Sequence, residues 1–104
     1  MRIVTDSDYG KEITLSLYEL FIVEIPYNPS TGELLSGPSF QKIENCQILK
    51  EFFVSDNPAL ADSPGKKIYF LITSAPLSSL LYWFFSAPSY VSQFSFKLTV
   101  LPTT

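Results

Sequence analysis

The fold is decided by a stretch near the end of the printed sequence, Phe94-Ser95-Phe96-Lys97-Leu98-Thr99-Val100. Large apolar residues occupy every second position, and the positions between them are polar. Because successive side chains of a β-strand point to opposite faces, this alternation predicts a strand with one face on a core and the other in water. Strands of this kind are typical of sheets that pack face to face in a β-sandwich.

Similar but weaker signals recur upstream. Six further segments carry strand signals, at residues 13–17, 20–25, 33–35, 48–54, 67–73 and 80–85. Gly37-Pro38 predicts a break after the third of these. The segment 41–54 is expected to be a loop followed by the strand at 48–54, with a short helix as the alternative. Turn-forming residues separate the segments, and the polar stretch 55–65 is predicted to be a long exposed loop. About seven short strands without a convincing amphipathic helix predict an all-β, immunoglobulin-like β-sandwich.

The composition is typical of one folded domain. A chain of 104 residues is long enough to bury one core and too short for a second, so we expect residues 1–104 to form a single domain. Hydrophobic residues make up 46% of the chain and aromatic residues 15%, which excludes disorder. The net charge is −3 and the charged residues are scattered. With no basic patch for a phosphate backbone, we expect no nucleic-acid partner.

The sequence lacks the residues on which most enzyme sites depend. It has no histidine, which removes the usual general base, the Ser-His and Cys-His pairs and any zinc site built from His and Cys. Cys46 is the single cysteine, so no internal disulfide is expected. Four aspartates are interpreted as solvated turn residues: Asp6, Asp8, Asp56 and Asp62. Without a phosphate-binding glycine loop or a calcium-loop spacing, we expect no catalytic residue, no metal and no cofactor.

Nothing in the sequence indicates a membrane span. The longest apolar run, Leu80 to Phe85, is far too short to cross a bilayer. The first residues, Met1 to Val4, run directly into the polar stretch Thr5 to Asp8, which does not resemble a signal peptide. A lone cysteine permits a reducing compartment. We therefore expect a protein of the cytoplasm or of a vesicular or lysosomal compartment.

One loop has an unusual composition, Ile25-Pro26-Tyr27-Asn28-Pro29-Ser30-Thr31-Gly32. Two prolines fix their own φ angles and push the residues before them out of the helical region, while Gly32 permits a positive φ. The expected result is a stiff loop of irregular backbone that is tipped by small uncharged residues. Such a tip can enter a narrow cleft at little entropic cost. The plain alternative is an ordinary hairpin connection.

One run of residues contains this loop and the segment before it, Tyr18-Glu19-Leu20-Phe21-Ile22-Val23-Glu24-Ile25-Pro26-Tyr27-Asn28-Pro29-Ser30-Thr31-Gly32. This run resembles the chagasin family of papain-like cysteine peptidase inhibitors. In that family two strands lead into an Asn-Pro-Thr-Thr-Gly loop, and the match needs no gap, with Ser30 in place of the first threonine. The resemblance implies a protein that is no enzyme and blocks a papain-like cysteine peptidase non-covalently with a wedge of three loops. The implied contacts of the first loop are Asn28, Pro29, Ser30, Thr31 and Gly32.

The other two family loops are altered in this chain. Asp62-Ser63-Pro64-Gly65 stands where the family has Gly-x-Gly-Gly, so only the final glycine remains. Ala87-Pro88-Ser89 stands where the family has Arg-Pro-Trp or Arg-Pro-Phe, which keeps the proline and loses the cation and the aromatic ring. Tyr90 follows one residue later as a substitute ring. A tryptophan that the family has after the first loop is replaced by Leu35. The resemblance implies that Asp62 to Gly65 and Ala87 to Tyr90 complete the wedge.

A second hypothesis comes from the segment 80–85. If Leu81, Trp83 and Phe85 face the core, then Leu80, Tyr82 and Phe84 face outward. The strand at 67–73, expected to pair with it, would add more apolar side chains to the same surface. Contiguous apolar patches are uncommon on monomers, although loops can cover them. The alternative function is therefore a non-inhibitory interaction module that dimerises or docks through the face of Tyr82 and Phe84.

Overall fold

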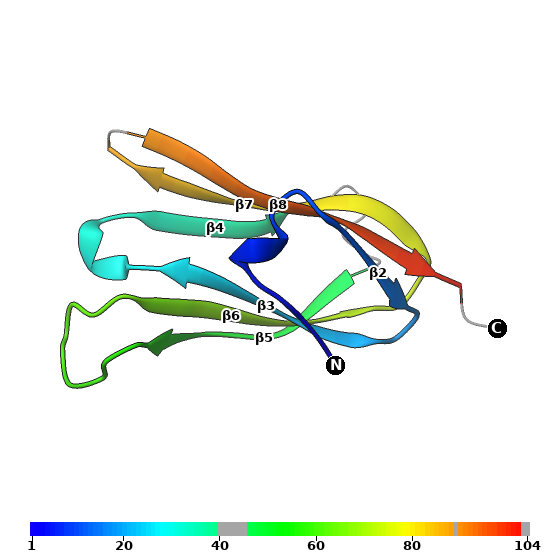
Figure 1. Ribbon diagram of the computed structural model, residues 1–104, viewed down its shortest axis with the longest axis horizontal. Coiled ribbons are helices and arrows are strands. Elements are labelled where there is room, and N and C mark those ends of the chain that lie inside the picture. The colour runs from blue at the N-terminus through cyan, green and yellow to red at the C-terminus, as the bar shows by residue number, and fades with distance from the viewer. Residues whose placement is uncertain (40–45, 89, 103–104) are drawn as a thin grey trace.

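The protein, seen in a computed structural model that describes residues 1–39, 46–88 and 90–102, is a sandwich of two sheets (Figure 1). One sheet has the spatial order β1 (Arg2–Val4), β3 (Leu20–Tyr27), β6 (Gly65–Thr73) and β5 (Cys46–Ser55). The other has the order β2 (Glu12–Ser16), β8 (Tyr90–Leu101), β7 (Leu77–Ala87) and β4 (Leu34–Ser39). Two short 3₁₀ turns, η1 (Asp6–Asp8) and η2 (Pro29–Thr31), lie in the connections.

The prediction of an all-β sandwich is confirmed, with eight strands in the described residues in place of about seven. The strand that was missed is β1, whose three residues are too few to show an alternation. It pairs in parallel with β3, and β2 pairs in parallel with β8, while the remaining pairs are antiparallel. Within the described part of the chain, no helix is long and apolar enough to cross a membrane.

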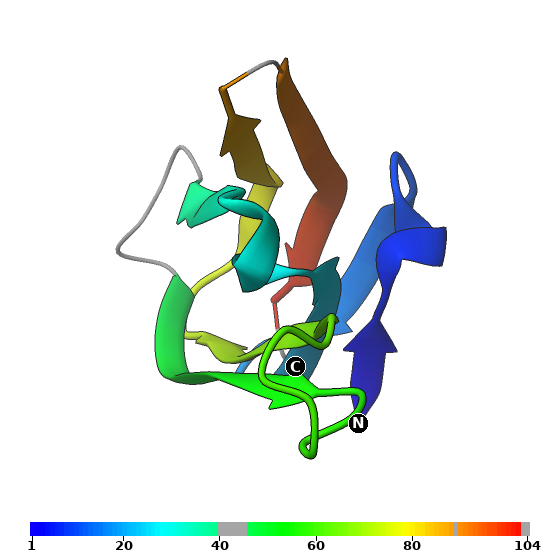
Figure 2. The ribbon, with the colours of Figure 1, turned by 90° about the vertical axis from the view of Figure 1, so that its left-hand side faces the viewer.

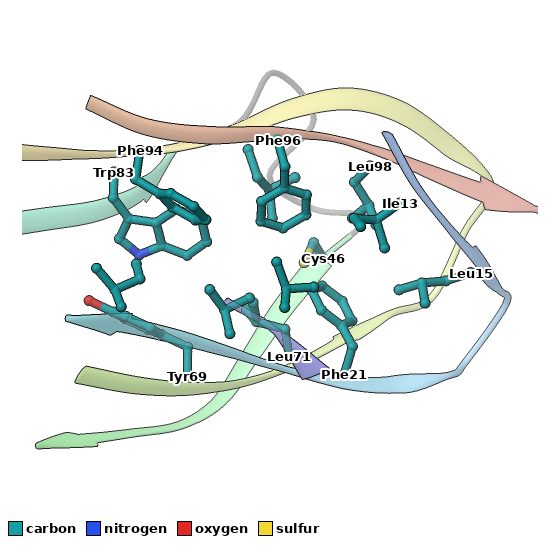
Figure 3. Packing of buried hydrophobic residues seen from close by; sticks show 14 of the residues in the cluster. Ile13, Leu15, Phe21, Cys46, Tyr69, Leu71, Trp83, Phe94, Phe96 and Leu98 are labelled. Atoms are coloured by element: carbon teal, nitrogen blue, oxygen red, sulfur yellow. The ribbon is translucent and has the colours of Figure 1, made fainter. Parts of the chain in front are cut away.

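The core lies between the sheets and is formed by alternate residues of both. The inward positions of β8, expected from the alternation, are all buried: Phe94, Phe96, Leu98 and Val100. Trp83 of β7 is completely buried, and its ring centroid lies 5.5 Å from that of Tyr69 on the opposite sheet (Figure 3). Aromatic rings in contact at such distances add to the free energy gained by burial alone. The sheets are therefore joined by close aromatic and aliphatic packing.

Two proline sites were expected outside regular structure and lie inside strands. Pro26 belongs to β3, which continues to Tyr27, because β1 ends opposite Val23 and leaves that side of β3 without a neighbour. Gly37-Pro38 lies within β4, at a shift of register between Ser36 and Ser39. Strand prolines are tolerated at edges and bulges, and β4 is an edge strand, so neither proline ends its strand.

The segment from 41 to 54 was expected to be a loop followed by a strand over 48–54, with a short helix as the alternative. The strand is confirmed and is longer than expected, since β5 runs from Cys46 to Ser55, and the helix alternative is wrong. Residues 40–45 lie outside the described residues. The poor periodicity of this segment has a physical reason: a register shift between Ile48 and Lys50 interrupts the alternation.

The expected pairing of the strands at 67–73 and 80–85 is wrong. These segments correspond to β6 and β7, which lie in different sheets. Phe84 is indeed 38% exposed, but polar partners flank it, Ser36 on β4 and Gln93 on β8. Tyr82 likewise lies opposite Ser95. The two-strand apolar surface is therefore absent, and a homodimer through Tyr82 and Phe84 has no support in the structure.

Gly65, at the start of β6, lies against the end of β5. A Cβ atom on Gly65 would overlap the Val54 carbonyl oxygen and lie 2.9 Å from Cα of Ser55. The lack of a side chain thus lets the two backbones approach where the connection between them begins.

We predict that Gly65→Ala lowers the free energy of unfolding by about 2–3 kcal/mol, because the added methyl group has to push two backbones apart. The matched control is Gly32→Ala, where the methyl group meets open space and only the positive φ of 79° opposes it, at a cost of about 1 kcal/mol. Urea unfolding of both variants provides the measurement. An equal or smaller loss at Gly65 would contradict the packing argument.

Cys46 begins β5 with its thiol in the core, and the residue is only 6% exposed (Figure 3). Burial raises the pKa of this thiol from 9.0 to about 11, since the thiolate would lose its hydration. Burial also raises the pKa of Tyr69 to about 12, with a smaller contribution from the charge of Glu51. Both groups therefore stay neutral in the folded state at pH values where the unfolded chain ionises.

We predict that the free energy of unfolding falls as the pH rises from about 9 to about 11, because only the unfolded chain releases the Cys46 proton in that window. Below pH 9 the thiol is neutral in both states and contributes no slope. Urea unfolding at several pH values should show a shallower fall for Cys46→Ala, and the fall that remains includes the contributions of Tyr69 and Tyr90. Identical slopes in parent and variant would refute the assignment to Cys46.

Candidate functional site

Three connections project from one end of the sandwich (Figure 1, left), and Figure 2 views them end on. The first loop, residues 28–33, joins β3 to β4, and the second loop, residues 56–64, joins β5 to β6. The third loop is the turn between β7 and β8 with its flanking residues Ala87 and Tyr90. In Figure 2 the first loop lies between the other two. The structure therefore gathers the segments that the resemblance assigned to one wedge.

Strand register explains why these loops meet. Tyr27 at the end of β3 lies opposite Gly65 at the start of β6, which places the first loop beside the second. Leu34 at the start of β4 lies opposite Ser86 near the end of β7, which places the first loop beside the third. Since β3 and β4 belong to different sheets, the first loop also bridges the two layers at this end.

The first loop is held in shape by its own hydrogen bonds. The Asn28 side-chain oxygen accepts from the Ser30 backbone N–H at 3.1 Å and from the Ser30 hydroxyl at 2.7 Å. The Thr31 hydroxyl donates to the Asn28 carbonyl oxygen at 2.9 Å, and Gly32 ends the turn with a φ of 79°. The expected positive φ at Gly32 is confirmed. The expectation that almost none of residues 25–32 is regular is wrong, because β3 continues to Tyr27 and Pro29–Thr31 form a 3₁₀ turn.

The exposed part of the first loop is its tip. Pro29, Ser30, Thr31 and Gly32 are all exposed, while Asn28 is partly buried. The tip carries no charge. A braced, neutral tip of small residues is the shape that the sequence predicted for entry into a narrow cleft.

The second loop is also ordered by polar contacts. The Ser63 hydroxyl accepts from the Asn57 backbone N–H at 3.0 Å and donates to the Pro64 carbonyl oxygen at 2.8 Å. The Asp56 N–H donates to the same Pro64 oxygen at 2.9 Å. Ser63 is only 7% exposed, while Asp62 and Pro64 are exposed. The loop therefore offers Asp62 and Pro64 to the outside and uses Ser63 internally.

The first two loops touch through one side chain. The Ser30 hydroxyl lies 3.2 Å from the Asp62 carbonyl oxygen, besides its contact with Asn28. A serine hydroxyl has a single proton, so the two carbonyl-type oxygens share it. Ser30, the one residue of the first loop that departs from the family pattern, is the residue that reaches the second loop.

The first and third loops touch through Glu33. Its carboxylate accepts a hydrogen bond from the Tyr90 hydroxyl, and its backbone oxygen accepts one from the Tyr27 hydroxyl at 2.7 Å. The hydrogen bond to Glu33 raises the pKa of Tyr90, since the phenol donates to a carboxylate. Sequence reasoning missed Glu33, which lies 57 residues from Tyr90. Its only signal was its place directly after Gly32.

The expected site residues thus have different surroundings. Exposed residues of the three loops form one end of the molecule: Pro29, Ser30, Thr31, Gly32, Asp62, Pro64, Pro88 and Tyr90. Asn28 and Ala87 are partly buried at the bases of their loops, and Ser63 and Gly65 are buried. Ser89 lies outside the described residues. The Gly65 backbone, which the resemblance implied as a contact surface, packs against β5.

No family model and no curated protein matches this sequence. Its structure is similar to three solved structures. The cysteine protease inhibitor EhICP2 from Entamoeba histolytica has a TM-score of 0.80 at 13% identity, covering 96% of this chain and 95% of that one. Amebosin has a TM-score of 0.75 at 19% identity, covering 96% and 97%. PbICP-C, solved in complex with falcipain-2, has a TM-score of 0.67 at 15% identity, covering 97% and 100%. The chain therefore shares the fold of these three proteins over nearly its whole length.

Proposed function

We propose that this protein inhibits papain-like cysteine peptidases by placing the tip of its first loop in the active-site groove, without forming a covalent bond. One observation carries the proposal. The loop with the family sequence, Asn28 to Gly32, is exposed at its tip, braced at its base and flanked by two other loops at one end of the fold. The fold itself is shared with PbICP-C, which was solved in complex with the papain-like peptidase falcipain-2.

A loop that inhibits a peptidase has to occupy the active site without being cleaved. A papain-like active site holds a reactive thiolate beside a histidine, and a peptide bound there in substrate geometry is cleaved. The 3₁₀ turn Pro29–Thr31 is a bent backbone and not an extended strand. Hydrogen bonds from Ser30 and Thr31 to Asn28 hold the bend in place. The loop then covers the thiolate without aligning a carbonyl for attack.

Rigidity also contributes to affinity. Each flexible side chain that becomes fixed on binding costs about 0.5–1.5 kcal/mol, and a loop that is ordered beforehand avoids much of this cost. The internal hydrogen bonds of the first two loops supply that order before any contact with an enzyme. Together the three loops are placed to approach the roughly 800 Å² per partner that is typical of protease–inhibitor complexes.

The departures from the family pattern limit the expected affinity. Ala87 has no charge and no ring, so the interface lacks the arginine of the family motif, a residue type that often dominates binding energy. A loss of about 2 kcal/mol relative to an interface with that anchor is of the expected size. The alternative function, docking through Tyr82 and Phe84, is not favoured, because the surface that motivated it is not formed.

We predict that Thr31→Arg weakens inhibition of papain at least about tenfold, or about 1.4 kcal/mol, because a long charged side chain replaces a small group at the tip. The matched control is Thr14→Arg, an exposed threonine of β2 that lies opposite Thr99 near the end of β8, whereas the third loop precedes the start of β8. Inhibition constants from peptidase assays on parent and variants provide the measurement. An unchanged constant for Thr31→Arg would remove the first loop from the mechanism, and a parent protein that inhibits no papain-like peptidase would refute the proposed function.

A further inference from the structure

Glu33 is the point at which the first loop, the third loop and the sheets meet. It lies between Gly32, which ends the first loop's turn, and Leu34, the first residue of β4. Its backbone oxygen is bound by the Tyr27 hydroxyl from the end of β3, which restrains its main chain. Its carboxylate is bound by the Tyr90 hydroxyl from the start of β8. Among the described residues Glu33 makes no salt bridge, so the phenol has no competing cation at this carboxylate.

The ring of Tyr90 remains accessible although its hydroxyl is hydrogen-bonded. Tyr90 is 48% exposed, and its hydroxyl donates a hydrogen bond to Glu33. The backbone of Tyr90 is paired with Ala87 across the third loop. One end of the side chain is therefore fixed by the hairpin and the other by Glu33, while much of the ring remains open to the outside.

A ring held in this manner has the properties of an interface anchor. Tyrosine offers a large contact area with only two side-chain torsions, and it is one of the residue types that most often carry binding energy. The third loop of this chain has no arginine and no tryptophan of its own, and Tyr90 brings the one aromatic ring among its described residues. Pro88 and the first-loop tip are exposed at the same end of the molecule.

We infer that Tyr90 is the aromatic contact of the third loop with the peptidase and that Glu33 is a positioning residue that holds this ring ready through the hydroxyl. This inference rests on the proposed function and assigns a role to Glu33, which does not itself touch the enzyme. The hydrogen bond orders the ring before binding, so less side-chain freedom is lost when the complex forms. It also couples the position of the third loop to the first.

The test measures inhibition of papain by five variants beside the parent. Tyr90→Ala removes the ring and should raise the inhibition constant about thirtyfold, as expected for an interface anchor. Tyr90→Phe and Glu33→Ala keep the ring but release it, and each should raise the constant about fivefold. The double variant of these two should be no weaker than either alone, because both remove the same interaction. Glu33→Gln should stay close to the parent, since its amide oxygen still accepts from the phenol.

The outcomes separate a positioning role from a merely structural one. Rescue by Glu33→Gln together with non-additivity supports the inference, whereas additive losses for Tyr90→Phe and Glu33→Ala would overturn the assignment of Glu33. A Tyr90→Ala variant that inhibits as well as the parent would overturn the assignment of Tyr90. Urea unfolding of all variants should match the parent, because both side chains lie at the surface end of the fold.

A second measurement tests the contact without any peptidase. Selective ¹³C labelling of tyrosine ring carbons allows the phenol of Tyr90 to be titrated by NMR in the free protein. Glu33→Ala should lower the pKa of Tyr90, because the hydrogen bond to Glu33 is the largest cause of its upward shift. An unchanged pKa would reject the inference while leaving the proposed function intact. A parent protein that does not inhibit rejects the proposed function, and with it the role of the ring, even if the pKa changes as expected.

Discussion

The structure depends on the contact between its two sheets around Trp83. Trp83 is completely buried. Its ring centroid lies 5.7 Å from that of Phe94 and 6.0 Å from that of Phe96 in its own sheet. The ring centroid of Tyr69 in the other sheet is 5.5 Å away. The single cysteine forms no disulfide, and apolar packing makes up the core between the sheets. The second loop extends from one sheet and the third from the other. Their separation is therefore determined by the core, and the first loop spans it.

Much of this arrangement could be predicted from local patterns. The alternation from Phe94 to Val100 was sufficient to assign both the strand and its buried face, because a period of two leaves no choice of side. The positive φ at Gly32 followed from its place at the end of a proline-containing turn. The family resemblance, carried by residues 18–32, predicted which three loops would gather at one end, which register then brought about.

The remaining features depend on partners distant in sequence. Alternation says which face of a strand is apolar but not which strand lies beside it, so β6 and β7 were wrongly paired. Pro26 and Pro38 were predicted to interrupt their strands. A strand tolerates a proline where no neighbouring strand needs its N–H or where a bulge occurs, and the local sequence does not show which strands are neighbours. The hydrogen bond between Glu33 and Tyr90 joins residues 57 positions apart, and no local sequence pattern predicts it.

The register shift in β5 has a consequence for how copies of this protein behave at high concentration. β5 is a ten-residue strand at the edge of its sheet, and it exposes Ile48, Leu49 and Val54. A long, apolar, regular edge of this kind would recruit the edge of another molecule and start aggregation. The bulge between Ile48 and Lys50 breaks the row of backbone donors and acceptors, and the Lys50 ammonium lies 5.3 Å from the ring of Phe52. An irregular edge with a charge at its centre is a poor template for a strand of a second molecule.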